Sequence, residues 1–226
     1  MKDTQKPSEV VVITGASKGL GQAMAVEFAR RGSMVVGLAR SEQGLAEAAA
    51  RIGEGRFVPL VVDVADATAV QRSFQSIEQT VGPVSILINN AAIYDHFDFL
   101  DAGPERFRES MRINLGGVVN CCHSALMGMT ERGTGRIVNV TTFADLAPLS
   151  GSSAYSVSKG AARCGARARR RCRRPFPWHR DFGLDSRCPG NGDGSCRRPR
   201  SGDRRASRGG ARARTQCFLQ WHAVRP

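Results

Sequence analysis

The stretch VVVITGASKGLG at residues 10–21 decides the fold of this chain. Its first four residues form a continuous β-branched run, which is typical of a strand buried on both faces in a parallel sheet. Gly15, Gly19 and Gly21 follow, and apolar positions then recur at helical spacing over residues 21–31. Gly32 stands where a glycine commonly ends a helix. The stretch therefore predicts a strand, a tight glycine turn and a helix in succession.

The same alternation continues for more than a hundred residues. Further strands are predicted at residues 34–39, 57–62, 84–88 and 136–140. Helices are predicted at residues 41–51, with Ser41 as N-cap, at residues 65–81, in a long region containing residues 111–129, and from about Ala154 onward. Repeated βα units of this length indicate an α/β fold, a Rossmann-type doubly wound parallel sheet in three layers.

Charge divides the chain into two parts. Residues 1–160 carry 15 Lys and Arg against 16 Asp and Glu, whereas residues 161–226 carry 18 Arg, no Lys and 4 Asp. The later part lacks Ile, Met, Glu and Tyr, so it offers too little apolar surface to offset the entropy of ordering the chain. We therefore predict one folded domain at residues 1–163 and a disordered Arg-rich tail at residues 164–226, with the C-terminal strands of the sheet missing or replaced by that tail.

Two explanations of the tail are considered. Arg, Gly, Pro, Ala, Ser and Cys without Lys, Ile or Glu are what GC-rich coding DNA yields when it is translated out of frame, so we hypothesise a frameshift close to codon 165. Alternatively, the tail is an arm that binds nucleic acid, since 18 Arg would neutralise phosphates and release counterions. Its few aromatic residues are not regularly interleaved with the arginines, which favours non-specific binding at most.

The sequence shows no targeting segment and no pattern of metal ligands. Residues 1–9 are polar, and no run approaches the roughly 18 apolar residues of a membrane span. We expect a cytoplasmic protein with no membrane contact. Cys121 and Cys122 fall in an apolar helical pattern and are expected to be reduced packing residues. No Cys-x-x-Cys pair is present, so no metal site is predicted.

The glycine turn suggests a site for a dinucleotide. Glycines between a strand and a helix let the backbone approach a pyrophosphate, which the free N–H groups of the helix can bind. An ordinary tight turn remains the alternative. The next strand ends at Arg40, where a pocket for an unphosphorylated ribose would be expected to offer an acidic residue. Arg40 and Lys18 can instead pair with a 2′-phosphate, so we predict NADP(H) in preference to NAD(H). A solvated surface arginine is the other interpretation of Arg40.

A second chemical signal is Tyr155-Ser-Val-Ser-Lys159. The spacing of four places Tyr155 and Lys159 one turn apart on the same face of a helix. A nearby ammonium favours the phenolate, so the pair can act as general acid and base near neutral pH. Tyr-x-x-x-Lys is common by chance, but this helix follows a predicted strand and so begins at the carboxyl edge of the sheet, where ligands bind.

Over residues 8–163 the chain resembles the short-chain dehydrogenase/reductase family, classical type. The resemblance rests on several motifs in the right order. They are Thr14-Gly15-Ala-Ser-Lys-Gly19-Leu-Gly21, Asp63-Val64, Asn89-Asn90-Ala91-Ala92, Asn114 in Ile-Asn-Leu-Gly, and Tyr155 with Lys159.

The resemblance implies specific roles. Tyr155 would exchange a proton with the substrate, Lys159 would hold the nicotinamide ribose and lower the Tyr155 pKa, and Asn114 would support a water-linked proton path; a helix-kink residue bonded to backbone is the other interpretation of Asn114. Thr142 stands where the family has a serine, and its hydroxyl would polarise the carbonyl. The cofactor contacts implied or predicted are Gly15, Ser17, Lys18, Gly19, Leu20, Gly21, Arg40, Ser41, Asp63, Val64, Asn90, Ala91, Ala92, Tyr155 and Lys159.

The function expected is hydride transfer between NADP(H) and a small secondary alcohol or ketone, with 3-oxoacyl thioester reduction as one candidate, and with activity impaired by the tail. An inactive cofactor-binding remnant is the alternative. Residues 93–104 are either one wall of the substrate site or ordinary packing. The family also implies a homo-oligomer that pairs through its long fourth and fifth helices.

Overall fold

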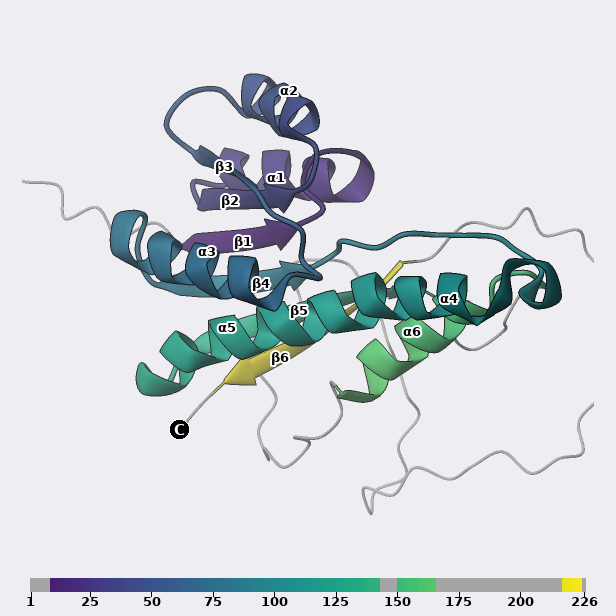
Figure 1. Ribbon diagram of the computed structural model, residues 1–226. Helices are drawn as coiled ribbons and strands as arrows, with labels where there is room; N and C mark the ends of the chain where they lie inside the picture. The colour runs from purple at the N-terminus through teal and green to yellow at the C-terminus, as the bar shows by residue number, and fades with distance from the viewer. Residues whose placement is uncertain (1–8, 143–149, 166–216, 225–226) are drawn as a thin grey trace, which may run out of the picture. The chain divides into compact units, whose positions relative to one another are not determined.

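The computed structural model describes residues 9–142, 150–165 and 217–224. Five strands form a parallel sheet: β1 (Val10–Thr14), β2 (Met34–Ala39), β3 (Phe57–Val61), β4 (Val84–Asn89) and β5 (Gly135–Thr142). A sixth strand, β6 (Cys217–Val224), pairs antiparallel with β5. The order across the sheet is β3-β2-β1-β4-β5-β6 (Figure 1). The predicted doubly wound parallel sheet is confirmed.

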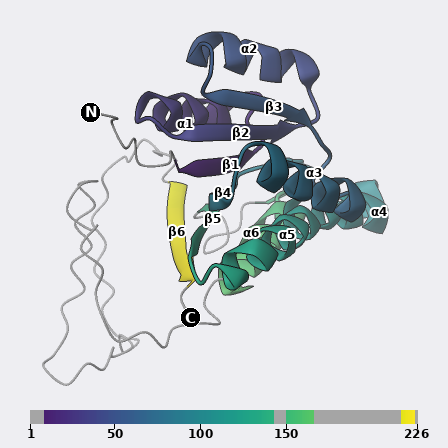
Figure 2. The ribbon, with the colours of Figure 1, turned by 90° about the vertical axis from the view of Figure 1, so that its left-hand side faces the viewer.

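Helices cover both faces of the sheet (Figure 2). Helices α1 (Gly19–Arg30) and α2 (Glu42–Ile52) lie on one face. Helices α3 (Ala67–Thr80), α5 (Gly117–Glu131) and α6 (Ser153–Gly165) lie on the other. This three-layer arrangement follows from right-handed crossovers that run outward in one direction from β1 to β3 and in the other from β4 to β5.

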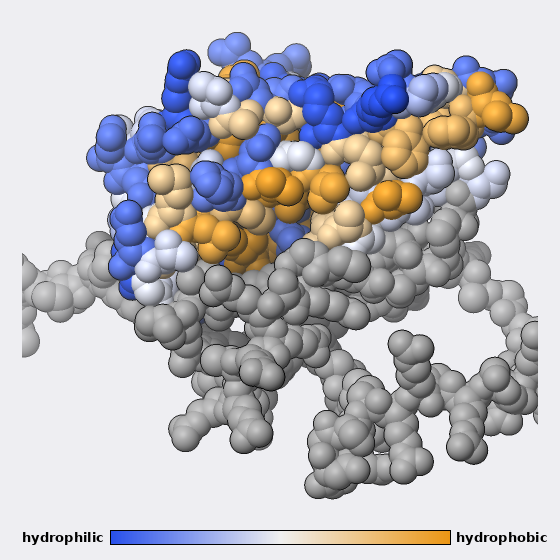
Figure 3. Space-filling model, turned by 60° about the horizontal axis from the view of Figure 1, so that its bottom comes forward, coloured by the Kyte–Doolittle hydropathy of each residue, from blue (hydrophilic) through white to orange (hydrophobic). Residues whose placement is uncertain are grey.

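The long helical region predicted around residues 111–129 is divided into three parts. Helix α4 (Phe99–Met111) is kinked at Gly103 and resumes at Pro104. A π-helical turn, η1 (Arg112–Gly116), joins it to α5. Helices α4, α5 and α6 leave large apolar side chains exposed, and Figure 3 shows apolar residues gathered among polar ones on one face of the molecule. These exposed residues are Phe99, Leu100, Val119, Met127 and Val157.

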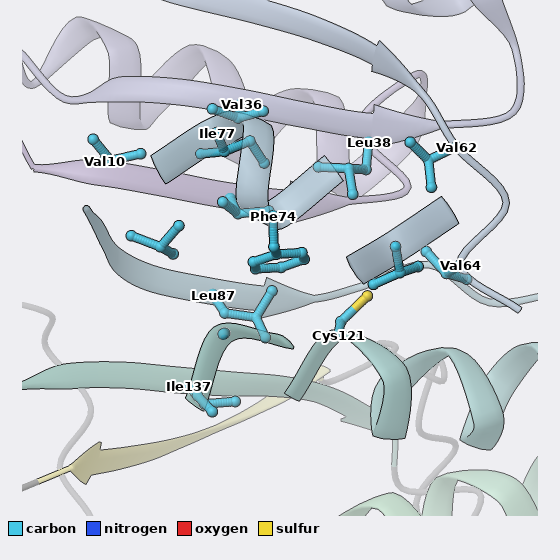
Figure 4. Close-up of a cluster of buried hydrophobic side chains, with 14 of the residues drawn as sticks. Val10, Val36, Leu38, Val62, Val64, Phe74, Ile77, Leu87, Cys121 and Ile137 are labelled. Atoms are coloured by element: carbon cyan, nitrogen blue, oxygen red, sulfur yellow. The ribbon is translucent and has the colours of Figure 1, made fainter. Parts of the chain in front are cut away.

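The strands alternate between two apolar cores, as strands covered on both faces must. Val10, Val12, Val36 and Leu38 point toward α3 and α5, where they meet Phe74, Ile77 and Cys121 (Figure 4). Val11, Ile13 and Val35 point the other way and pack with Ala25 and Leu45 of α1 and α2. Strand β3 contains Pro59, which lacks an N–H donor and is tolerated because β3 is the edge strand.

The tail was expected to be disordered throughout, and for residues 217–224 this prediction is wrong. Strand β6 lies beside β5 along its whole length, from Gly135 opposite Val224 to Thr142 opposite Cys217. Composition averaged over 66 residues hides this segment, because four of the eight large apolar residues of the tail, Phe218, Leu219, Trp221 and Val224, fall in it. Residues 166–216, with most of the arginines proposed to bind nucleic acid, lie outside the described residues.

Candidate active site

The glycine turn after β1 is built by close backbone packing. A Cβ on Gly21 would lie 2.2 Å from the carbonyl oxygen of Gly15, and one on Gly15 would lie 2.9 Å from Cα of Ala91. Gly15 and Gly19 also have φ of +69° and +58°, which side chains rarely adopt. No atom lies within 4 Å of a Cβ built on Gly19. The turn thus closes on itself and leaves open space at Gly19, at the N-terminus of α1, as a pyrophosphate site requires.

Thr14 and Asn90 fasten this turn to the end of β4. The side-chain amide of Asn90 donates to the carbonyl oxygens of Thr14 (3.0 Å) and Gly15 (3.3 Å). The Thr14 hydroxyl accepts from the backbone N–H groups of Asn90 and Ala91, both at 3.0 Å. Asn90 therefore holds the shape of the turn itself, a role that the sequence did not reveal. Thr14, one residue before the glycines, was not predicted as a site residue.

The cations assigned to a 2′-phosphate lie after β2, at Arg40, and in the glycine turn, at Lys18. Arg40, Ser41, Lys18 and Leu20 are exposed, and Ser17 is half-buried. Ser41 is the N-cap of α2, as predicted, because its hydroxyl accepts from the backbone N–H of Gly44 at 3.1 Å. Arg40 contributes, after the larger effect of Arg112, to lowering the pKa of Glu109.

The segment after β3 holds Asp63 and Val64 in place. An Asp63 oxygen accepts from the backbone N–H of Ala65 at 3.0 Å, and the other lies 3.7 Å from the Arg112 guanidinium. Val64 is buried against Gly117, where a Cβ would lie 2.6 Å from its methyl group. Asp63 and Val64 thus lie at the same edge as the glycine turn. Ala91 is half-buried and Ala92 exposed after β4, beside Asn90.

Helix α6 carries Tyr155 and Lys159, as the spacing predicted. Lys159 is buried, with a relative exposure of only 4%. Its ammonium donates to the carbonyl oxygen of Val140 at 3.0 Å and lies 5.7 Å from the centre of the Tyr155 ring. The helix thus places a buried cation beside the phenol, at the carboxyl end of β5. Thr142 is half-buried at that same end of β5.

Asn114 lies in the π-turn η1 and is almost fully buried. Its oxygen accepts from the N–H of Ile93 at 2.8 Å, and its amide donates to the Ile93 carbonyl at 2.9 Å and to the Ser158 hydroxyl at 3.2 Å. The interpretation of Asn114 as a backbone-bonded residue at a helix irregularity is therefore what the structure shows. The water-linked proton path stays a prediction.

Two polar residues that fix α6 were not identified from the sequence. Ser158, fully buried, donates to the Tyr155 carbonyl at 2.7 Å while it accepts from Asn114. Asn139 of β5 accepts from Asn89 at 2.9 Å and donates to the Ala162 carbonyl at 3.4 Å. Their only signal is polarity: Asn139 interrupts an apolar strand, and Ser158 adjoins Lys159.

The cysteines and the possible metal ligands among the described residues form no second candidate site. Cys121 and Cys122 are free thiols, as predicted, and burial raises the pKa of Cys121 to about 12. Within the described ranges, no group of His, Cys, Asp and Glu residues is arranged to hold a metal ion. None of the helices described there combines the length and the apolar character needed to cross a membrane.

Comparison with known proteins agrees with this geometry. A sequence family described as short chain dehydrogenase matches residues 9–171. A probable oxidoreductase, EphD, of Mycobacterium tuberculosis is 41% identical over 155 residues, 67% of this chain and 26% of EphD. A 3-oxoacyl-[acyl-carrier-protein] reductase of Bos taurus is 36% identical over 152 residues, 67% of this chain and 64% of that reductase. The chain thus spans about a quarter of the first relative and under two thirds of the second.

Solved structures give the same result. NAD+-bound xylitol dehydrogenase superposes with a TM-score of 0.68 at 27% identity, over 72% of this chain and 64% of that one. A single-residue variant of actinorhodin polyketide ketoreductase with NADPH superposes with a TM-score of 0.68 at 29% identity, over 70% of this chain and 62% of that one. One of these neighbours holds NAD+ and the other NADPH.

Proposed function

The chain belongs to the short-chain dehydrogenase family, and we propose that its site transfers a hydride between NADP(H) and a secondary alcohol or ketone, with reduction of a 3-oxoacyl thioester as one candidate reaction. The observation that carries the proposal is the placement of Lys159. A buried ammonium beside the Tyr155 ring, at the carboxyl end of β5, is the arrangement that lowers a phenol pKa. The relatives that are named as reductases or dehydrogenases support the reaction class.

The proposed proton chemistry belongs to Tyr155. In reduction its hydroxyl donates a proton to the substrate oxygen, and in oxidation the phenolate accepts that proton. Lys159 stabilises the phenolate by charge, and the Thr142 hydroxyl donates a hydrogen bond to the developing oxyanion. Asn114 would support the return of the proton through water to Lys159. The nicotinamide, when bound, supplies or accepts the hydride.

The residues present fit such a cofactor. The packed turn at Gly15 and Gly21 and the open space at Gly19 suit a pyrophosphate. We propose that Arg40 and Lys18 pair with a 2′-phosphate, that Ser17, Leu20 and Ser41 lie around it, and that Asp63, Val64, Asn90, Ala91 and Ala92 line the adenosine and ribose. One solved neighbour contains NAD+ and another NADPH, so the fold alone does not select between them. The proposed preference for NADP(H) therefore rests on Arg40.

Cofactor binding tests the role of Arg40. Titrating the protein with NADPH and NADH, followed by nucleotide fluorescence, should give a tighter dissociation constant for NADPH. Arg40→Gln removes one charged partner and should reduce this preference by about tenfold, because a charge-assisted hydrogen bond contributes about 1.5–3 kcal/mol. Arg51→Gln, on the exposed last turn of α2, is the matched control. Equal affinity for the two cofactors in the unaltered protein would refute the assignment.

Turnover tests the reaction. NADPH oxidation should be followed spectrophotometrically with a panel of ketones and a 3-oxoacyl thioester, in the unaltered chain and in Tyr155→Phe. Turnover that is lost in Tyr155→Phe supports the proposal. Tight NADPH binding without turnover of any panel member, in a well-folded protein, would favour the alternative of a non-catalytic remnant.

We propose that the residues after α6 result from a change of reading frame close to codon 165. The family match ends at residue 171, six residues after α6, and the following stretch differs from residues 1–160 in composition and charge. Resequencing the coding DNA from codon 155 and translating all three forward frames tests it. Another frame that encodes an apolar helix and a β-branched strand supports the hypothesis, and an error-free single frame rejects it. Loss of a cellular phenotype on deleting residues 165–226 alone would favour the nucleic-acid arm.

We also propose a cytoplasmic location and a homo-oligomer. The exposed Val119 and Met127 of α5 support pairing through α4 and α5, since apolar side chains of this size gain from burial between two copies. Light scattering after gel filtration should give at least twice the chain mass. Val119→Glu with Met127→Glu should reduce it to the monomer, and a monomeric unaltered protein would contradict the pairing.

A further inference from the structure

The segment between β4 and α4 alternates strictly in exposure. Ile93 and Asp95 are half-buried and Phe97 is buried, whereas Tyr94 and His96 between them are exposed. An extended chain points successive side chains to opposite sides, so one side of this segment faces the protein and the other faces outward. We call Tyr94 and His96 the outer row.

The inward residues are each fixed by a separate contact, so the segment is held at three successive points. These contacts are the backbone of Ile93 with the side chain of Asn114, the carboxylate of Asp95 with the guanidinium of Arg106 through two bonds of 2.6 Å, and the N–H of Phe97 with the carbonyl of Gly151 at 2.9 Å. The guanidinium of Arg106 also lies 5.3 Å from the centre of the Phe97 ring. The backbone that carries the outer row is therefore anchored through the inward-facing residues.

Tyr94 of the outer row lies directly against the proposed reacting group. The Tyr94 and Tyr155 rings are 5.0 Å apart between centres, with an interplanar angle of 87°, an edge-to-face pair. Tyr94 nevertheless keeps 57% of its surface exposed. The His96 ring packs on Gly151, where a Cβ would lie 2.5 Å from Cε1. Tyr94 thus stands beside Tyr155 with surface available for a ligand.

The charges next to the outer row are already engaged. Arg106 lowers the pKa of Asp95, and Asp95 raises that of Arg106, so the pair is mutually neutralised. Asp98 is the N-cap of α4 and accepts from the N–H of Leu100 at 2.9 Å. What Tyr94 offers a substrate is therefore aromatic surface rather than a free charge.

We infer that Tyr94 recognises the substrate and selects a carbonyl compound, or the matching alcohol, that carries a planar aromatic group next to the reacting carbon. Such a group can stack on the exposed part of Tyr94 while the carbonyl oxygen reaches the Tyr155 hydroxyl. A flexible aliphatic chain of equal size gains less, because it must be ordered and offers no ring to stack. The inference rests on the proposed function for the position of the reacting carbon, but recognition by Tyr94 is separable from turnover.

Binding of two ketones with eight carbons each, acetophenone and 2-octanone, tests the inference. Dissociation constants should be measured by ligand-observed NMR on the full chain saturated with NADPH, and again without the nucleotide. Acetophenone should bind roughly tenfold more tightly, since one aromatic pair of this kind is sufficient for such a ratio. Tyr94→Leu should abolish the ratio and Tyr94→Phe should keep it. Phe99→Leu, an exposed ring on α4 that pairs with Phe107 instead, should also keep it.

The outcomes separate the two proposals. Equal binding of the two ketones, no binding of either, or a ratio that survives Tyr94→Leu would overturn the inference. Selective binding that depends on Tyr94 but proceeds to no turnover would uphold the inference and contradict hydride transfer by this chain. Far-UV circular dichroism of Tyr94→Leu should match that of the unaltered protein, since Tyr94 is mostly exposed.

Discussion

The glycine turn after β1 and helix α6, which carries Tyr155 and Lys159, face the same edge of the sheet but are held in place by different means. The turn is shaped by close backbone packing at Gly15 and Gly21, which any side chain would block, and is tied to β4 by Asn90. Helix α6 is fixed by buried polar side chains that reach it from other elements, with Asn114 bonding Ser158 and Asn139 bonding Ala162. The glycines that shape the proposed cofactor side lie in one short stretch of sequence, whereas the buried hydrogen bonds that hold the proposed catalytic side join elements distant in sequence.

This difference predicts different responses to substitution. On the turn, any added atom should be costly, because backbone cannot move aside. On α6, the loss of a single hydrogen-bonding atom should be costly, because its buried partner is left without a substitute. The following substitutions and one titration test each half in turn.

Tyr155→Phe should have the largest effect, since it removes the proposed proton donor while keeping the ring. We expect turnover to fall by at least about 100-fold, the lower range for loss of a general acid or base, with the NADPH dissociation constant changed less than twofold. Steady-state kinetics and fluorescence titration measure the two quantities. Tyr94→Phe, which alters the neighbouring ring in the same way, is the matched control. Equal turnover in Tyr155→Phe and the unaltered protein would remove Tyr155 from the mechanism.

Gly21→Ala tests the backbone side of the comparison. Its Cβ would lie 2.2 Å from the Gly15 carbonyl oxygen, and overpacking of this kind costs up to about 3 kcal/mol. Denaturant unfolding and NADPH titration should both show the loss. Gly116→Ala is the control, since its nearest contact would be the Met111 oxygen at 3.9 Å. If the two variants behaved alike, close packing would not define the turn.

Ser158→Ala tests the side-chain half. It leaves the Asn114 amide without its second acceptor, and a buried unpaired donor costs about 2 kcal/mol. We expect that loss in the free energy of unfolding, together with a pH profile of turnover displaced from that of the unaltered enzyme, because α6 carries Tyr155. Ser76→Ala, at an exposed position of α3, should change neither quantity. A stable variant with an unchanged profile would show that the bond to Asn114 does not position the helix.

Alkaline titration tests the burial of Cys121 in the apolar core. Burial raises the pKa of Cys121 from 9.0 to about 12, so the folded state favours the protonated thiol. Its contribution to stability is full below pH 9 and is lost as the pH rises from 9 toward 12. At pH 10 the loss should be about 1 kcal/mol. Urea unfolding at pH 8 and pH 10 should show a smaller decrease in Cys121→Ala than in the unaltered protein; parallel decreases would contradict the assignment.

The sequence predicts the proposed cofactor side better than the proposed catalytic side. The first is marked by a local pattern, whereas the second depends on contacts between residues that are distant in sequence. Residues 10–21 contain the strand, the turn and the helix start together, so local pattern suffices. Tyr155 and Lys159 are also found locally, since four residues separate them. Asn139, Ser158 and the anchor of Asn114 at Ile93 depend on contacts between elements 21 to 50 residues apart, and no local pattern marks them.

Boundaries and strand partners show the same limit. The predicted strand at residues 57–62 and helix at residues 65–81 differ from β3 and α3 by one or two residues at their ends. Strand β6 was missed because its partner β5 lies 75 or more residues earlier in the chain. The mean composition of a long region does not reveal a short segment that becomes ordered by pairing with a strand far away in the sequence.

The π-turn η1 makes the length of the chain between α4 and α5 a determinant of the site. Each residue of an α-helix turns the chain by about 100°, and a π-turn holds one residue more than the regular helix would. Deleting one residue between Arg112 and Gly116 would let α4 and α5 form one continuous helix. Everything on α5 would then rotate relative to α4, and Asn114 would turn away from Ile93. The number of residues in η1, and not only their identity, therefore determines the geometry of the candidate site.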